Sequence, residues 1–210
     1  CKGCNVLYHL AFVNGTKHFY ENPKLVLDVG VKGALNTLEA AIENNVSKYI
    51  LASSSEVYQQ PENIPTKEDE RLIIPDVMNT RYSYAGGKMI SELLAINYLR
   101  DTNINLKIFR PHNIFGPKMG FEHVIPEIIQ KLYIVSEGWV KKKCKLNIQG
   151  SGEETRAFCF IDDAIDQIHL IQENEGEEII FHIGQSTERS ILNLIKAKII
   201  KQKDTLSYKQ

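Results

Sequence analysis

The stretch YILASSSE, residues 49–56, changes abruptly from apolar side chains to hydroxyl and carboxylate side chains. Tyr49, Ile50, Leu51 and Ala52 suit a buried strand, and the polar residues 53–56 follow where that strand would end. In open parallel sheets, ligands bind outside the carboxyl ends of the strands. The stretch therefore predicts a buried parallel strand that ends at a polar site.

The segments around this strand favour an α/β fold. An apolar run at residues 5–11 predicts an earlier strand, and apolar residues at helical spacing over 23–44 predict a long helix. Residues 84–99 predict a second helix, and residues 105–110 predict a third strand that also ends in a polar turn. Strands alternating with helices in this order predict a parallel sheet covered by helices.

The periodicity changes after Gly116 and Pro117, where shorter elements begin. They are helices near 124–133, 162–173 and 191–201 and strands near 146–149, 156–160 and 179–183. We therefore expect a main domain over residues 1–117 and a smaller α/β substrate lobe over 118–210, with some return of the chain to the main domain. Substrate would bind between the two.

Composition excludes several classes of protein. The chain has 210 residues, of which 43% are hydrophobic and 24% charged, and its net charge is −1. This balance predicts a globular protein without the general attraction to phosphate of a nucleic-acid binder. No apolar run is long enough for a membrane span, so we expect a soluble, cytoplasmic protein. Cys1 and Cys4 have metal-knuckle spacing, but no second pair completes a zinc site, and we predict no metal.

The second predicted helix places two reactive side chains together. Tyr84 lies four residues before Lys88, so both project from the same helical face, whereas Tyr82 points elsewhere. A nearby ammonium favours the phenolate and would lower the pKa of Tyr84 from about 10. Chance produces this spacing in many helices, but here polar clusters end the strands before and after it. The pair is therefore predicted to act as a proton acceptor.

Six segments together resemble the NAD-dependent epimerase/dehydratase family of the extended short-chain dehydrogenase/reductase superfamily, whose members act on nucleotide sugars. They are residues 9–11 (HLA), 33–41 (GALNTLEAA), 53–58 (SSSEVY), 84–88 (YAGGK), 110–117 (RPHNIFGP) and 156–163 (RAFCFIDD). Each is weak alone, and the six in the family's order are specific. The resemblance implies a Rossmann-type doubly wound parallel sheet.

The resemblance also implies a role for each of three catalytic residues. Tyr84 would remove the proton of a sugar hydroxyl, usually that on C4, while hydride passes to NAD. Lys88 would hold the nicotinamide ribose and keep Tyr84 acidic. Ser54 would hydrogen-bond the oxygen undergoing oxidation and stabilise its developing charge.

Other residues would hold the two ligands, NAD and a nucleotide-diphosphate sugar. Those implied for the cofactor are Ala11, Ser53, Tyr84, Lys88, Arg110, Pro111 and His112, and those implied for the substrate are Ser54, Asn113 and Arg156. The planar guanidinium of Arg156 suits a diphosphate clamp. The alternative for Arg156 is a surface ion pair with Glu153 or Glu154.

Glu56 bears on the type of reaction. In dehydrating or decarboxylating family members a glutamate here is a base near C5 or C6, and dehydratases place an aspartate acid before it. Ser55 stands in that position, which disfavours a 4,6-dehydratase. We therefore predict an epimerase, with a decarboxylase or dehydratase of the same family as the alternative. A remnant without catalytic activity, or an interaction protein that keeps the fold, is the alternative of another class.

Two family features are missing from this sequence. The glycine-rich phosphate loop GxxGxxG and the strands around it are absent, which predicts an N-terminally truncated fragment that binds NAD poorly by itself. Where the family often has Asn-Val-x-Gly-Thr, this chain has GVKGA at 30–34, which predicts altered cofactor positioning. Relatives commonly dimerise through two large-lobe helices, here near 26–44 and 84–99, so we expect a homodimer in the full-length form.

Overall fold

The computed structural model describes residues 1–121, 123–141, 145–148 and 150–196. Internal contacts group the chain into two compact units. The first contains Cys1–His112 and the returning segment Asp163–Ile183, and the second contains Asn113–Asp162 with the described part of 184–210.

A four-stranded parallel sheet organises the first unit, in the order β1 (Val6–His9), β2 (Lys48–Ala52), β3 (Asn105–Pro111) and β7 (Ile180–Ile183). In its register His9 lies opposite Leu51, and Ala52 lies opposite Phe109. The carboxyl ends of β1, β2 and β3 therefore meet at one edge, as predicted for the polar segments that follow them. The predicted α/β fold with a parallel sheet is confirmed.

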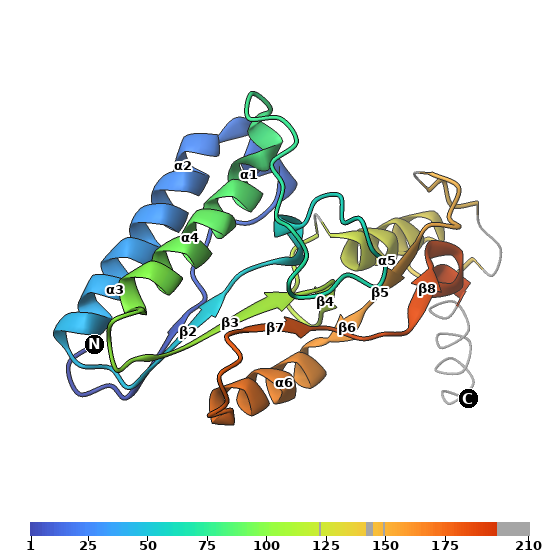
Figure 1. The fold of residues 1–210 in the computed structure, drawn as a ribbon. Coiled ribbons are helices and arrows are strands. Elements are labelled where there is room, and N and C mark those ends of the chain that lie inside the picture. Colours follow the sequence, from blue (N-terminus) through green and yellow to red (C-terminus); the bar gives the residue numbers. More distant parts are fainter. Residues whose placement is uncertain (122, 142–144, 149, 197–210) are drawn as a thin grey trace. The chain divides into compact units, whose positions relative to one another are not determined.

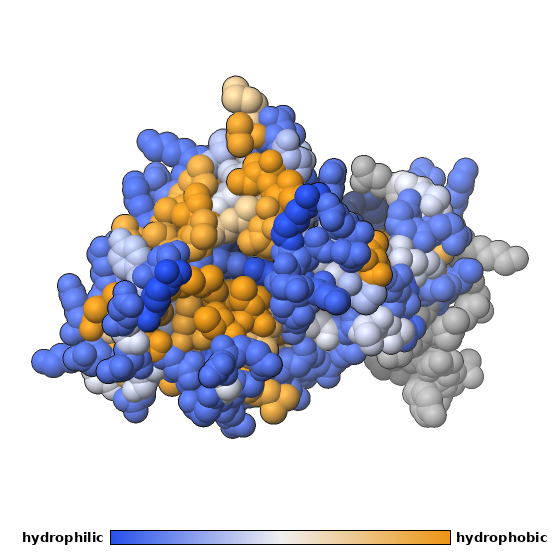
Figure 2. Space-filling model, in the orientation of Figure 1, coloured by the Kyte–Doolittle hydropathy of each residue, from blue (hydrophilic) through white to orange (hydrophobic). Residues whose placement is uncertain are grey.

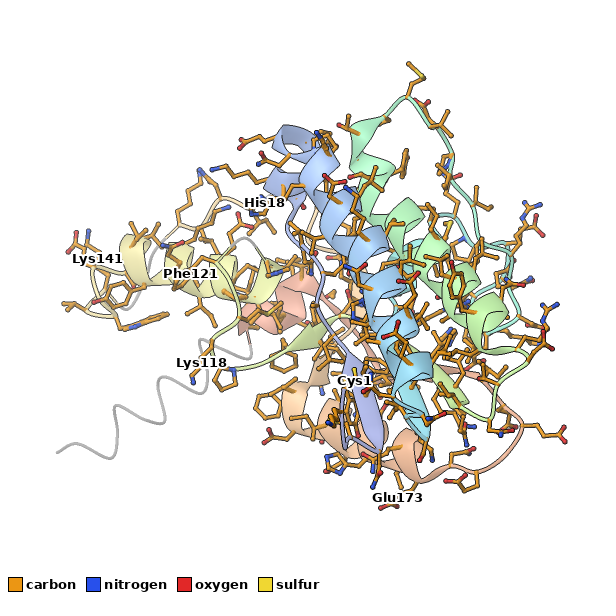
Figure 3. The ribbon with its side chains drawn as sticks, turned by 90° about the vertical axis from the view of Figure 1, so that its left-hand side faces the viewer. Cys1, His18, Lys118, Phe121, Lys141 and Glu173 are labelled. Atoms are coloured by element: carbon orange, nitrogen blue, oxygen red, sulfur yellow. The ribbon has the colours of Figure 1, made fainter. Side chains whose placement is uncertain are left out.

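Helices cover both faces of this sheet (Figure 1). One face carries α1 (Thr16–Glu21), α2 (Pro23–Leu27), a π-helix η1 (Asp28–Lys32), α3 (Gly33–Glu43) and α4 (Ser83–Leu99). Figure 3 shows α6 (Ile161–Glu173), labelled at Glu173, on the opposite face. Leu38 of α3 and Ala95 of α4 pack against Leu51 and Ile108 of the strands, which forms the main core.

The second unit contains two short sheets. Strand β4 (Ile114–Phe115) pairs with β6 (Cys159–Phe160) in parallel, and β5 (Thr155–Ala157) pairs with β8 (Glu188–Ser190) in antiparallel. The remaining elements are α5 (Val124–Val135) and a helical segment over residues 191–196. Ile128 and Leu132 of α5 pack against Ile195, which forms the core of this unit.

Several predicted elements differ from the structure. Residues 146–148 of the strand predicted at 146–149 are not in a strand, and residue 149 lies outside the described part. The strand predicted at 156–160 is divided at Phe158 between two sheets. The helix predicted over 23–44 contains the π-helical turn, and the last residues of the helix predicted at 191–201 lie outside the described part.

Figure 2 shows hydrophobic residues gathered on the surface of the helices of the first unit. Leu25, Leu27, Ile90 and Leu93 are exposed members of α2 and α4. Among the described residues, none of the helices has the length and apolar character needed to cross a bilayer. The same residues include no cluster of three or more potential metal ligands from histidine, cysteine and acidic side chains.

Candidate active site

The chain leaves β2 in an extended conformation that separates two neighbouring serines. Successive side chains of an extended chain point to opposite sides. Ser53 donates a hydrogen bond to Glu92 in the interior, whereas Ser54 caps a short turn at Ser55–Val57, where its Oγ accepts a hydrogen bond from the Glu56 N–H at 3.2 Å. Ser54 also lies close enough to Tyr84 to lower the pKa of its hydroxyl. The strand end therefore delivers one hydroxyl to the tyrosine and one to the core.

Tyr84 stands in the first turn of α4 and is packed between two phenylalanines. Its ring stacks on Phe19 at a centroid distance of 5.0 Å and meets Phe12 edge to face at 5.2 Å. Burial raises the pKa of the Tyr84 hydroxyl, the Ser54 hydrogen bond opposes that rise, and the Glu56 carboxylate adds to it. Ser54 is thus near enough to influence the Tyr84 hydroxyl, as their predicted convergence requires.

Lys88 follows one turn later and is also buried. Its ammonium donates a hydrogen bond to the Ala52 carbonyl at 2.6 Å and lies 4.2 Å from the centroid of the Phe12 ring. Burial lowers the pKa of Lys88 to about 8, against the attraction of Glu92. The pKa of Tyr84 was expected to fall because of Lys88, but in the structure it is raised, since the ammonium lies 5.8 Å from the Tyr84 ring and burial dominates.

Glu56 lies at the outer side of this site. Its side chain is 48% exposed, and its carboxylate is 3.8 Å from the guanidinium of Arg81, which is 39% exposed. The Gln59 side chain donates to the Glu56 carbonyl at 2.6 Å. Solvent screens an ion pair of this kind, so Arg81 holds the Glu56 side chain only weakly and the carboxylate is open to a ligand.

Arg110 is directed into the protein. Its guanidinium makes a two-point pair with Glu92, at 2.9 and 2.6 Å, and donates further hydrogen bonds to the Tyr58 hydroxyl and to the Glu68 carbonyl. Only 2% of the Arg110 surface is exposed. Arg110 and Ser53 were predicted to line the cofactor site, and in the structure both bind the Glu92 carboxylate beneath the strand ends. Their role toward a cofactor remains a prediction.

The other residues predicted for the cofactor lie near the same strand ends. Ala11 is exposed just after β1, and Pro111 is the half-buried last residue of β3. The ring of His112 lies 4.7 Å from that of His182, and burial together with His182 lowers the pKa of His112 to about 4. His112 is therefore a neutral ring near physiological pH.

The predicted substrate residues Asn113 and Arg156 belong to the second unit. Asn113 donates a hydrogen bond to the Ala157 carbonyl at 3.2 Å. Arg156 lines a cavity of about 330 Å³ with Lys131 and Glu127 of α5, with Glu154 and with apolar side chains. Glu154, the alternative partner of Arg156, instead accepts hydrogen bonds from the backbone N–H groups of Ser151 and Gly152 at 3.0 and 2.8 Å.

The first unit keeps polar atoms that fit a nicotinamide nucleotide. Among the described residues, the Lys88 ammonium makes one hydrogen bond although it carries three protons. The buried Nε2 of His112 and Oγ of Ser83 have no hydrogen-bond partner within the described part of the chain. Buried polar atoms rarely stay unpaired, so these groups suit a ligand rich in hydroxyl and amide groups.

Sequence reasoning missed three groups of this site. Glu92 continues the four-residue spacing of Tyr84 and Lys88, and this spacing could have indicated it. Arg81 lies three residues before Tyr84, without a pattern to mark it. Phe12 lies between β1 and α1, where no periodicity indicates the direction of a side chain.

Comparisons with known proteins identify the family and its relatives. A model of the NAD dependent epimerase/dehydratase family matches residues 1–184. UDP-glucuronic acid decarboxylase 1 of Arabidopsis thaliana is 28% identical over 198 residues, covering 93% of this chain and 42% of that protein. UDP-N-acetyl-alpha-D-glucosaminuronate decarboxylase of Bacillus cytotoxicus is 29% identical over 190 residues, covering 89% of this chain and 56% of that protein.

Solved structures share the fold. UDP-N-acetylglucosamine 4-epimerase from Methanobrevibacter ruminantium M1 aligns with a TM-score of 0.79 and 23% identity, covering 93% of this chain and 59% of that one. The chain spans about two-fifths of the length of the first curated relatives that it matches. Since the family model covers most of the chain, this protein belongs to the NAD-dependent epimerase/dehydratase family.

Proposed function

We propose that this chain carries the catalytic residues of an NAD-dependent enzyme that oxidises C4 of a nucleotide-linked sugar. The proposal rests chiefly on the placement of Tyr84 and Lys88 one turn apart on α4, both buried, with Ser54 close enough to lower the pKa of Tyr84 and the Lys88 ammonium bound to the Ala52 carbonyl at the end of β2. A hydroxyl pair of this kind can hold a sugar hydroxyl and accept its proton. The decarboxylases among the curated relatives support a nucleotide-sugar substrate.

The residues would divide the work as follows. Tyr84 takes the proton of the sugar hydroxyl, and Ser54 donates a hydrogen bond to the oxygen on which charge develops. Lys88 offers its remaining N–H groups to the nicotinamide ribose, and its positive charge favours loss of the Tyr84 proton. Bound NAD supplies the acceptor for the hydride that leaves carbon.

The second unit would hold the nucleotide diphosphate. Arg156 and Lys131 line a cavity together with apolar residues such as Ile128 and Leu146 and with the carboxylates of Glu127 and Glu154, of which Glu127 is paired with Lys131 at 2.5 Å. A diphosphate would compete with Glu127 for Lys131 and would bind mainly to Arg156. Cations suit the diphosphate, and an apolar wall suits a nucleotide base. The Glu154 carboxylate accepts hydrogen bonds from the backbone of Ser151 and Gly152, which reduces its tendency to pair with Arg156.

The reaction that follows oxidation decides between two enzymes. Epimerisation was predicted from the sequence, but the names of the curated relatives favour decarboxylation of a uronic sugar slightly. A 4-keto group withdraws electrons from the C5–C6 bond, so it promotes loss of the C6 carboxylate. Glu56 and Arg81 would then face C5 and C6, with the guanidinium supplying charge for the carboxylate.

A product assay tests the proposal. Because the sequence predicts weak NAD binding, the assay uses NAD at concentrations that saturate a weak site. We expect the protein then to convert UDP-glucuronic acid with release of carbon dioxide, and the sugar product is identified by nuclear magnetic resonance. Exchange of UDP-glucose and UDP-galactose, without release of carbon dioxide, would assign epimerisation instead. Conversion of none of these sugars, by protein that is folded and binds both ligands, would contradict catalysis and favour a remnant without activity.

Substitution of Glu56 separates the two reactions. Glu56→Gln removes a base but keeps the shape, so a decarboxylase should lose about 10²–10⁴-fold in turnover whereas an epimerase should keep most of it. Glu62→Gln is the matched control, because Glu62 is an exposed partner of Arg71. Equal effects of both substitutions would exclude a specific role for Glu56.

A further inference from the structure

The Phe12 ring is inserted against two glycines on neighbouring helices. A β-carbon at residue 30 would lie 2.1, 2.4 and 2.8 Å from three atoms of the ring, and one at residue 87 would lie 2.9 Å from its Cζ. Real β-carbons essentially never approach so closely, so any larger residue at position 30 would displace the ring. Neither Gly30 nor Gly87 has a positive φ, and both are helical, so backbone freedom does not explain them. They provide space for Phe12.

Phe12 touches both reactive side chains from this slot. The Lys88 ammonium lies over its face at 4.2 Å, and the Tyr84 ring meets it at 5.2 Å with an interplanar angle of 80°. The negative face of an aromatic ring attracts a cation, and edge-to-face contact fixes the angle between two rings. The Lys88 ammonium therefore has two contacts that hold it, the hydrogen bond to the Ala52 carbonyl and the cation–π contact with Phe12.

We infer that Phe12 is a positioning residue of the active site, seated in the slot formed by Gly30 and Gly87, and that it sets where the Lys88 ammonium and the Tyr84 ring lie. Gly30 is one of the positions at which this sequence departs from the family pattern, and the structure gives the departure a physical reason. The inference rests on the proposed function for its catalytic meaning. Its geometry can be tested on the protein without any ligand.

Coupling between Phe12 and Gly30 is the first test. Gly30→Ala should lower the melting temperature of the protein, because the new methyl group displaces the ring. In a Phe12→Ala background the same change should raise the melting temperature, because alanine favours a helix and the obstacle is gone. Gly33→Ala is the matched control: a β-carbon there meets its nearest neighbour, His9, at 3.7 Å, so its effect should be the same in both backgrounds.

The pKa of Lys88 separates positioning from packing. The titratable groups that act on Lys88 or lie beside it are Glu92 and Tyr84 on α4 and His9 on β1. In Phe12→Ala, water replaces the ring, so the Lys88 pKa should rise from about 8 toward 10.5. In Phe12→Leu, the site stays apolar but loses the aromatic face, so that pKa should stay at or below about 8. Gly30→Ala should shift it as Phe12→Ala does.

Both quantities can be measured on the protein alone, by thermal unfolding and by the Cε chemical shift of labelled Lys88 across pH. The inference is supported if Gly30→Ala lowers the melting temperature of the parent but raises that of Phe12→Ala, and if the Lys88 pKa rises in Phe12→Ala. Equal Gly30→Ala effects in both backgrounds, or an unchanged Lys88 pKa in Phe12→Ala, would overturn it. Neither result depends on turnover, so failure here is distinct from failure of the product assay.

Discussion

The buried ammonium of Lys88 should cost this protein stability at neutral pH. A fall of its pKa from 10.5 to about 8 corresponds to about 3 kcal/mol for burying the charged form. Lys88→Met keeps a straight, unbranched chain and removes the charge. The change also loses the hydrogen bond to Ala52 and the contact with Phe12, together worth about 1–2 kcal/mol. The variant should therefore be more stable than the parent by about 1–2 kcal/mol near pH 7.

The pH dependence gives this prediction its sign. Below pH 8 Lys88 is protonated in both the folded and the unfolded protein, and the folded protein bears the full cost. Between about pH 8 and 10.5 the unfolded lysine keeps its proton while the folded one has lost it, so the free energy of unfolding rises with pH. The advantage of Lys88→Met should therefore shrink across this window and be smallest above it.

Urea unfolding of parent and variant at several pH values measures the difference. Lys107→Met is the matched control, because Lys107 is also buried but donates to Gly176, Glu178 and Asn174 at 2.7, 2.8 and 3.3 Å. Removing that well-paired ammonium should destabilise the protein. A Lys88→Met variant that is less stable than the parent at pH 7, or a difference that does not change between pH 7 and 10.5, would refute the reasoning.

Three further predictions concern other residues. Glu92→Gln should destabilise the protein by about 3–5 kcal/mol in urea unfolding, because it leaves the buried Arg110 charge without its partner; a loss below 1 kcal/mol would argue against the pair. Ser54→Ala should lower kcat by about 10²–10³-fold in steady-state assays, with the fold kept, since it removes a donor to the developing charge; unchanged kcat would exclude that role. Arg156→Ala should weaken binding of UDP in calorimetric titration by about tenfold or more, whereas Arg189→Ala, on the partner strand, should have little effect; equal effects would exclude a specific clamp.

Sequence reasoning succeeded where a pattern has one structural meaning. Apolar runs that end in polar residues identified the parallel strands, and the four-residue spacing placed Tyr84 and Lys88 on one face of α4. Strands of a parallel sheet are buried on both faces, so alternation could not tell that Arg110 points to the interior. The direction of the Tyr84 pKa depends on burial by Phe12 and Phe19, which come from segments distant in sequence.

Two features of the second unit also lacked a signal in the sequence. The strand β8 has three residues, two of them exposed, so it lacks a hydrophobic signal. The turn between β5 and β6 at Phe158 changes sheet partner without a glycine or proline to mark it. The predicted homodimer and the predicted boundary at residue 117 remain predictions. The exposed apolar residues on α2 and α4 are the surface on which the predicted homodimer can be tested.

In the proposed reaction Tyr84 takes a proton while C4 of the sugar is oxidised. The most direct test of this step is the absorbance of reduced nicotinamide after rapid mixing of the NAD-loaded protein with the nucleotide sugar that the product assay identifies. The native protein should show reduced nicotinamide within a turnover, Tyr84→Phe should slow its appearance by about 10²–10⁴-fold, and Tyr82→Phe should leave it unchanged. Reduction at the native rate in folded Tyr84→Phe protein would contradict the account.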